Sequence, residues 1–202
     1  MDVRRLVLRG TPVAFGVVSL LHPVPGSRPI VEALEPDLRR WLLVHVAQLA
    51  LLALLAATLW LLVDGLSSCA ATVCRVALVP FLAFYSAFDA VVGIGTGTLV
   101  GLARGLDGDA RTTAVRLAQA FWDARLSQGA AIFAVIAAAH LAWLVAVGAA
   151  VVALRQAGAS RTIAALLALA GALFAVGHPW PTGTAAMAGL SAVTWIRTSR
   201  SA

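Results

Sequence analysis

The chain has 202 residues, of which 61% are hydrophobic and only 12% are charged, whereas about 25% are charged in a typical soluble domain. This composition excludes a soluble globular domain, a disordered chain and a disulfide scaffold, and it indicates a polytopic membrane protein. The net charge of +6 comes from arginines at the ends of apolar runs, where topology determinants lie, so nucleic acid is not expected as a partner.

The first apolar run, residues 6–21, predicts a marginal terminal span or signal anchor. It contains Arg9, and Gly10 and Pro12 are expected to break a helix there. Its 16 residues fall just short of the about 20 that cross the hydrocarbon core. A cleaved signal peptide is the alternative, but no small-x-small cleavage site precedes His22.

Long uncharged runs predict four firm transmembrane helices. The clearest, Trp41–Val63, contains ten leucines and has Trp41 and Trp60 near its two ends, as expected of aromatic belts at the two membrane surfaces. The other three are expected at about Val76–Ala103, Leu126–Leu154 and residues 162–178.

The last uncharged run, Thr162–Ile196, is too long for one crossing because it has 35 residues. The segment His178-Pro179-Trp180-Pro181 interrupts it, and proline both ends a helix and fits the first turn of the next. We therefore expect a break and a second marginal helix at about 181–196. The predicted fold is an all-α transmembrane bundle, one integral-membrane domain over residues 1–202 with about six spans.

Residues 104–129 form the longest polar connection. Arg116, Gln119, Asp123 and Ser127 recur there at helical spacing opposite an apolar face. This pattern predicts an amphipathic helix lying in the membrane interface, and packing of that helix on the protein itself is the alternative.

The two sides of the membrane are predicted by alternation of the crossings. The connections expected to share one face are 22–40, 104–129 and 179–183, and those expected on the other are 64–75 and 155–161. The arginine count places 104–129 in the cytoplasm if there are four spans and leaves the orientation open if there are six. Cys69 and Cys74 are expected as free thiols, with a local disulfide as the alternative in an oxidising compartment.

Asp89 lies in the middle of its predicted span, where an ionised carboxylate costs about 2.5–3.5 kcal/mol on insertion scales. It should therefore face the bundle interior. Tyr85, Asp89, Gly93, Gly97 and Gly101 recur every four residues, and the glycines predict a close-packing face for another helix. The third firm span offers His140 at a similar depth, so a hydrogen bond between Asp89 and His140 is predicted. Such a buried polar seam serves either as a static structural pair or in proton or solute movement.

A second set of residues comprises His22, His45 and His178, which alternation places towards the same face. His22 and His178 occur in similar contexts, each followed by proline at the end of an apolar run. Imidazoles bind zinc and haem iron, so these residues form a candidate metal or haem site. The alternative is that they cap helices or bond to carbonyl groups.

Four short motifs, LHP at 21–23, WxxxH at 41–45, YxxFDxxxGIGTG at 85–97 and HPxPxG at 178–183, resemble a group of uncharacterised multipass membrane proteins from GC-rich bacteria. The resemblance implies a helical bundle in the bacterial inner membrane and assigns no catalytic role.

Two functions follow as expectations. The first is a non-enzymatic membrane protein whose polar seam moves protons or a small solute, or assembles with another membrane protein or a second copy in the lipid bilayer. The second is a histidine-ligated metal- or haem-binding membrane protein, which includes a metal-dependent hydrolase.

Overall fold

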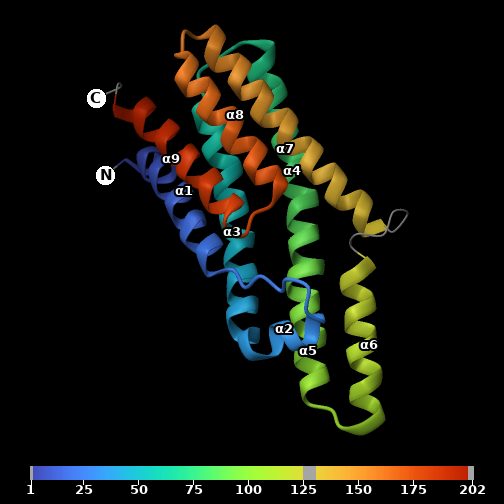
Figure 1. Ribbon diagram of the computed structural model, residues 1–202. Helices are drawn as coiled ribbons and strands as arrows, with labels where there is room; N and C mark the ends of the chain where they lie inside the picture. The colour runs from blue at the N-terminus through green and yellow to red at the C-terminus, as the bar shows by residue number, and fades with distance from the viewer. Residues whose placement is uncertain (1, 125–130, 200–202) are drawn as a thin grey trace.

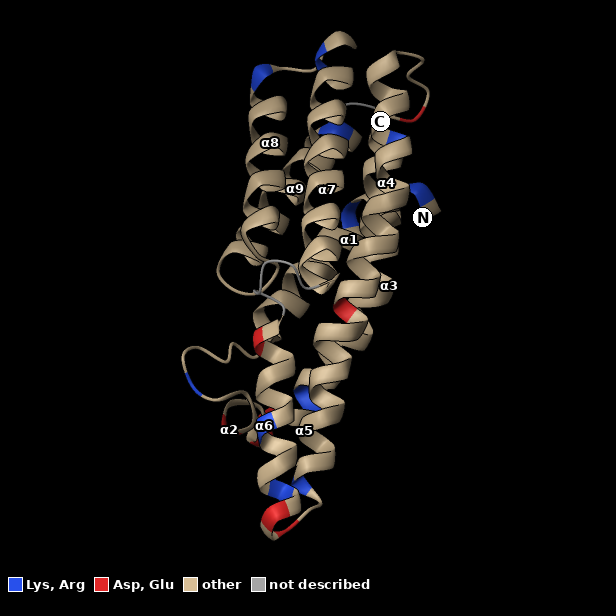
Figure 2. Cartoon of the chain, turned by 90° about the vertical axis from the view of Figure 1, so that its right-hand side faces the viewer, with Lys and Arg blue, Asp and Glu red and all other residues tan. Residues whose placement is uncertain are grey.

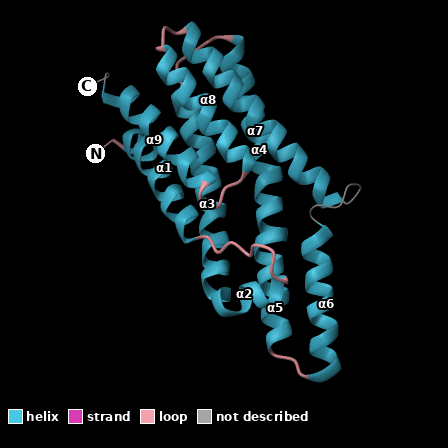
Figure 3. Ribbon diagram, in the orientation of Figure 1, coloured by secondary structure: helices cyan, strands magenta, loops and turns pink. Residues whose placement is uncertain are grey.

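The computed structural model describes residues 2–124 and 131–199, and the regular structure in these two ranges is helical (Figure 1; Figure 3). The elements are α1 (Val3–Leu21), α2 (Ile30–Leu34), a 3-10 turn (Glu35–Asp37), α3 (Leu38–Leu62), α4 (Cys69–Phe88), the π-helical segment η2 (Asp89–Gly95), α5 (Thr96–Arg104), α6 (Gly108–Ala124), α7 (Ala131–Gln156), α8 (Arg161–Val176) and α9 (Thr182–Ser199). The predicted all-α bundle is confirmed.

Within the described ranges, three stretches are long and apolar enough to cross a membrane: Ile30–Leu62, Cys69–Arg104 and Ala131–Gln156. Their mean hydropathies are 2.2, 1.8 and 2.3. They overlap the first three of the four firm predicted spans, and residues 126–130 of the third predicted span lie outside the described residues. The shorter α8 has 16 residues, so the total number of crossings stays a prediction. The break expected after the fourth span is confirmed, because it falls between the end of α8 and the start of α9.

The terminal helices α1 and α9 pack against each other along the bundle, and both chain ends lie towards the end where α3 connects to α4 (Figure 1). Arg9 donates from Nε to Thr198 Oγ1 at 2.8 Å and stacks over the Trp195 ring at 4.2 Å. The charge within the first apolar run is therefore accommodated between two helices. The predicted break at Gly10 and Pro12 is wrong, since α1 continues through both residues.

An aromatic cluster fixes α8 against α4 and α7. The Trp143 ring centroid lies 4.8 Å from that of Phe81 and 4.8 Å from that of Phe174. The Trp143 indole also donates to the carbonyl of Gly171 at 2.9 Å. All three rings and the hydrogen bond are buried, so the C-terminal end of α8, which leads to His178, has a defined position beside α4.

A smaller unit formed by α2, α5 and α6 lies beside the first part of α3 (Figure 1). Its buried apolar residues are Ile30, Val31, Leu34, Trp41, Val100 and Ala118. The helix predicted within 104–129 is present as α6 and packs on the protein, alongside α5. Gln119 ties it to α2 by accepting a hydrogen bond from the Ile30 amide at 2.8 Å. Ser127 lies outside the described residues, and an interfacial position of α6 stays a prediction.

The second long helix is longer than a membrane is thick. Its 36 residues extend about 54 Å, whereas the hydrocarbon core is about 30 Å thick. Charged residues gather at the tip of α5 and α6 and at the opposite end of the molecule, as Figure 2 shows. The 36-residue stretch is therefore longer than one perpendicular crossing needs, and where the unit of α2, α5 and α6 lies relative to a membrane stays a prediction.

The connection between α3 and α4 lies at the opposite end and is tied to α1 by an exposed ion pair. Arg4 donates to Asp64 Oδ2 at 2.6 Å, and this hydrogen bond holds the pKa of Asp64 below its ordinary value. Cys69 and Cys74 are both free, the first exposed and the second buried.

Candidate metal centre

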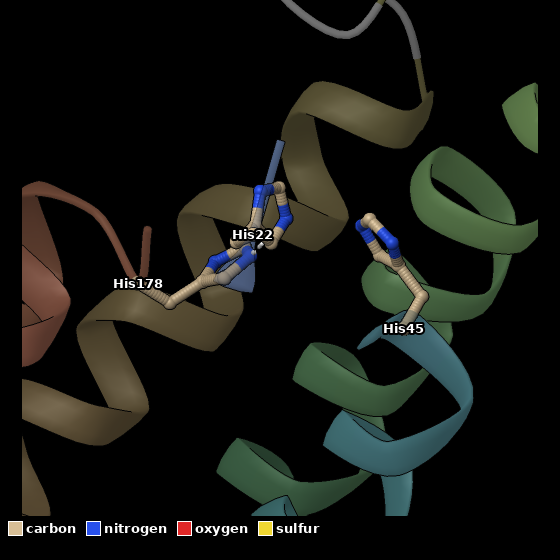
Figure 4. Close-up of side chains that lie close together, drawn as sticks. All are labelled: His22, His45 and His178. Carbon is tan, nitrogen blue, oxygen red and sulfur yellow. Dashed lines mark hydrogen bonds between the residues drawn. The ribbon is translucent and has the colours of Figure 1, made fainter. Parts of the chain in front are cut away.

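Three histidines from different parts of the chain meet inside the protein. His22 follows the last residue of α1, His45 lies in the second turn of α3, and His178 lies between α8 and α9. One ring nitrogen from each lies within 4.8 Å of the other two. Figure 4 shows the three side chains converging from separate segments. The structure therefore brings together the full set of His22, His45 and His178 that the sequence proposes as ligands.

The hydrogen bonds of His22 and His45 define which nitrogen is available. His22 Nδ1 lies 2.7 Å from the carbonyl oxygen of Pro23, and His45 Nδ1 lies 2.8 Å from that of Trp41. Because a carbonyl oxygen only accepts, both Nδ1 atoms carry the proton and donate it. Each Nε2 then has a free lone pair, which is the arrangement typical of metal-binding histidines.

His178 completes the set and is oriented by a tyrosine. Its Nδ1 lies 3.0 Å from Tyr85 Oη, and its Nε2 lies 3.3 Å from His22 Nε2. Two nitrogens bound tetrahedrally to zinc at about 2.0–2.1 Å are themselves about 3.3 Å apart. The observed spacing is thus that of two ligands of one ion.

The same spacing also has a metal-free explanation. His178 Nε2 can donate a hydrogen bond to His22 Nε2 while the Tyr85 hydroxyl donates to His178 Nδ1. Binding of an ion would require the other tautomer, in which His178 Nδ1 donates to the Tyr85 oxygen. The two states differ in which nitrogen of His178 carries the proton and in the direction of the Tyr85 hydroxyl hydrogen, and they share the same heavy-atom contacts.

The π-helical segment places its backbone directly against His45. A Cβ atom on Gly93 would lie only 1.8 Å from His45 Cδ2, so the imidazole fills the space that any side chain there would need. The Trp41 indole donates to the Gly93 carbonyl at 2.6 Å, which joins α3 to η2 just beside the histidine. Such π-helical turns often occur at functional sites.

A cavity of about 120 Å³ adjoins the three histidines, and Asp89 and Trp122 also line it. A water molecule takes up about 30 Å³ in the liquid, so the cavity has room for an ion and a few waters. Pockets for larger organic ligands measure about 300–1,000 Å³, so the cavity favours a bare ion over a haem group.

Asp89 is directed to this cavity. Its side chain is 1% exposed, and its Oδ2 atom has no hydrogen-bond partner within residues 2–124 and 131–199. A buried carboxylate oxygen without a partner is costly and calls for an explanation.

The structure does not form the predicted hydrogen bond between Asp89 and His140. His140 Nδ1 bonds to the carbonyl oxygen of Ile136 at 2.8 Å, and its ring packs edge-on against Tyr85 with centroids 5.7 Å apart. Tyr85 therefore takes the place beside His140 that Asp89 was expected to take.

The predicted close packing of the glycine face is observed, but its partner is α3 rather than α7. Cβ atoms on Gly97 and Gly101 would lie 2.6 Å from Leu42 and 3.5 Å from Leu38, respectively, and both leucines belong to α3. Together with Gly93 against His45, these contacts bring η2 and α5 close to the first half of α3.

Sequence reasoning missed the π-helical segment and the role of Trp41 in bonding to it. The Gly-Ile-Gly-Thr-Gly run at 93–97 is the signal that could have indicated an irregular helix. Gln48 lies one turn after His45 on the stripe that His45 shares with Trp41 in the sequence, and its buried side-chain amide has no partner in the part of the chain that the structure describes.

Comparisons with known proteins give no relative: no family model matches the chain, and no curated protein and no solved structure matches it. The resemblance carried by the four short motifs stays a prediction.

Proposed function

We propose that this protein is a multi-pass membrane protein of the bacterial inner membrane that binds a divalent transition-metal ion, zinc in the first place, through Nε2 of His22, His45 and His178. The observation that carries the proposal is the common pattern of the three imidazoles, in which each Nδ1 bonds to an oxygen and each Nε2 is directed towards the other two rings. Imidazole nitrogens suit zinc, copper, iron and nickel, and sets of three histidines are a known zinc environment.

The depth of the site supports access for an ion. His45 lies five residues after Arg40, which corresponds to about 7.5 Å along α3. Arginines mark the membrane surface in multi-pass proteins, so the metal centre would lie just inside one surface of the bilayer. The adjacent unit of α2, α5 and α6 would cover it on the aqueous side.

Assembly with a second membrane protein through the glycine face has less support. That face is covered by α3 of the same chain, so it is not available to a helix from outside. The Asp89 and His140 pair on which proton movement was predicted is not formed.

Metal analysis of the purified protein tests the proposal. After loading with zinc and removal of free ion, the wild-type protein in detergent should retain one zinc ion per chain, and H45A and H178A should lose it. His140 provides a matched control, since it is a histidine of the same bundle outside the cluster, and H140A should retain the ion. Size-exclusion profiles and melting temperatures show whether each variant is folded. A folded H45A variant that binds as much zinc as the wild type would contradict the proposal.

A further inference from the structure

We infer that the fourth position of the ion is open to water and that Asp89 is the general base for that water, so that the site hydrolyses an acyl ester of an anionic phospholipid. This inference rests on the proposed metal centre. The inference adds a reaction and a substrate class to that metal centre.

The first argument is the number of ligands and the space beside them. Three protein ligands and one exchangeable position characterise catalytic zinc sites, whereas structural sites are closed by four protein ligands. The structure supplies three imidazoles and, next to them, a cavity of about 120 Å³. That volume leaves space for water beyond the ion itself.

The second argument is the carboxylate. Asp89 lines the same cavity, is almost fully buried, and has one oxygen without a partner among the described residues. A carboxylate placed beside a metal-bound water can accept its proton. The orphaned Oδ2 atom is the acceptor that such a step needs.

The chemical step balances with water as the only co-reactant. Asp89 takes one proton from the bound water, and the resulting hydroxide attacks the ester carbonyl carbon. The bond between that carbon and the alkoxy oxygen then breaks, and the proton on Asp89 passes to the leaving alkoxide. The products are one fatty acid and one lysophospholipid, and Asp89 returns to its carboxylate form.

The third argument identifies the substrate class. A groove of about 540 Å³ lies between α1 and α3, with Val18, Leu21, Leu43 and Ala47 among its apolar lining residues and Arg39 and Arg40 at its charged end. Two of its lining residues, Leu21 and Val44, directly precede His22 and His45 in the chain, so the groove runs alongside the segments that carry two of the proposed ligands. Its apolar part suits an acyl chain.

The charged end of the groove favours an anionic headgroup. Arg40 is paired with Asp37 at 2.8 Å, whereas Arg39 forms no ion pair with any residue that the structure describes. Basic residues at the membrane surface attract anionic lipids. In a phospholipid the acyl ester lies just below the phosphate, and His45 likewise lies about 7.5 Å deeper than Arg40.

Release of fatty acid from defined lipids tests the inference. Zinc-loaded wild-type protein is mixed with micelles containing phosphatidylglycerol, and in parallel with phosphatidylcholine of the same acyl chains. We expect fatty-acid release that is faster with phosphatidylglycerol and that a chelator abolishes. D89N should retain one zinc ion per chain and lose at least about 100-fold in rate, which is the usual contribution of a general base. R39Q should reduce the preference for phosphatidylglycerol, and H140A should behave as the wild type.

Three other results would each overturn a stated part of the account. Zinc-loaded wild-type protein that releases no fatty acid overturns the inference and leaves the metal site standing. This measurement needs no variant, so it holds even if D89N does not fold. Loss of zinc from a folded D89N variant would identify Asp89 as a fourth ligand and the site as closed. Absence of zinc from the loaded wild type would remove the proposed function as well.

Discussion

Replacement of Gly93 by alanine should remove the metal without removing any ligand. The added methyl carbon would lie 1.8 Å from His45 Cδ2, 2.5 Å from Cγ and 2.6 Å from Nε2. Carbon atoms in contact are normally about 3.5–4.0 Å apart, so the ring has to retreat by at least about 1.7 Å. Neither the glycine nor its methyl group touches an ion, which separates this variant from a direct ligand substitution.

The expected loss of zinc affinity follows from how little the length of a bond between a metal and its ligand can vary. Bond lengths in metal sites stay within about 0.2 Å of their usual values, and the displacement of His45 is several times larger. Weakening the support of a ligand typically costs about 10–100-fold in metal affinity, so loss of the ligand itself should cost at least the upper end of that range.

Zinc affinity is measured by competition with a chromophoric chelator in detergent, for G93A and for the control G101A. A Cβ atom on Gly101 would have its nearest neighbour, Leu38 Cδ2, at an ordinary 3.5 Å, so G101A should bind zinc as the wild type does. A folded G93A variant with wild-type affinity would refute the placement of His45 as a ligand.

Three further predictions address the orientation of His178, the packing of α8 and the ion pair between Arg4 and Asp64. Y85F removes the hydroxyl that orients His178 and should weaken zinc binding about 10–100-fold. Unchanged zinc affinity of Y85F in the chelator competition would show that this hydrogen bond has no positioning role. G171A would place a methyl carbon 2.5 Å from a valine of α7 and should destabilise the fold by about 1–3 kcal/mol. The control G148A, whose methyl carbon would have no atom within 4 Å, should not destabilise it. Equal melting temperatures of G171A and G148A would contradict the packing of α8 on α7. Because the pKa of Asp64 is lowered by its arginine partner, its contribution to stability is present above the unfolded-state pKa and is lost as the pH falls through the folded-state pKa. Wild type should therefore melt above D64N at pH 7, and the difference should vanish in acid; a difference that persists there would exclude the ion pair as its cause.

The helices could be predicted because charged residues mark the ends of the apolar runs. Arg40 and Asp64 bracket the uncharged run of α3, and burial of charge in lipid is costly, so the predicted ends of that helix lie within a turn of the observed ones, Leu38 and Leu62. The continuity of α1 could not be predicted, because the effect of a proline depends on the neighbouring helices that pack around it.

The candidate site could be predicted in part. Alternation of the crossings grouped His22, His45 and His178 towards one face, and the structure brings them together. Counting residues along a helix gives depth. It does not give rotation about the helix axis once a π-helical segment interrupts the regular period. Asp89, which begins that segment, lines the cavity beside the three histidines, and Tyr85, one turn earlier in α4, lies beside His140 instead.

X-ray absorption spectroscopy at the zinc edge of the loaded protein tests the central claim most directly. The account predicts three imidazole nitrogens at about 2.0–2.1 Å with one further oxygen. A sulfur atom at about 2.3 Å would identify a cysteine as ligand, and fewer than three imidazoles would show that the ion does not bind where His22, His45 and His178 meet.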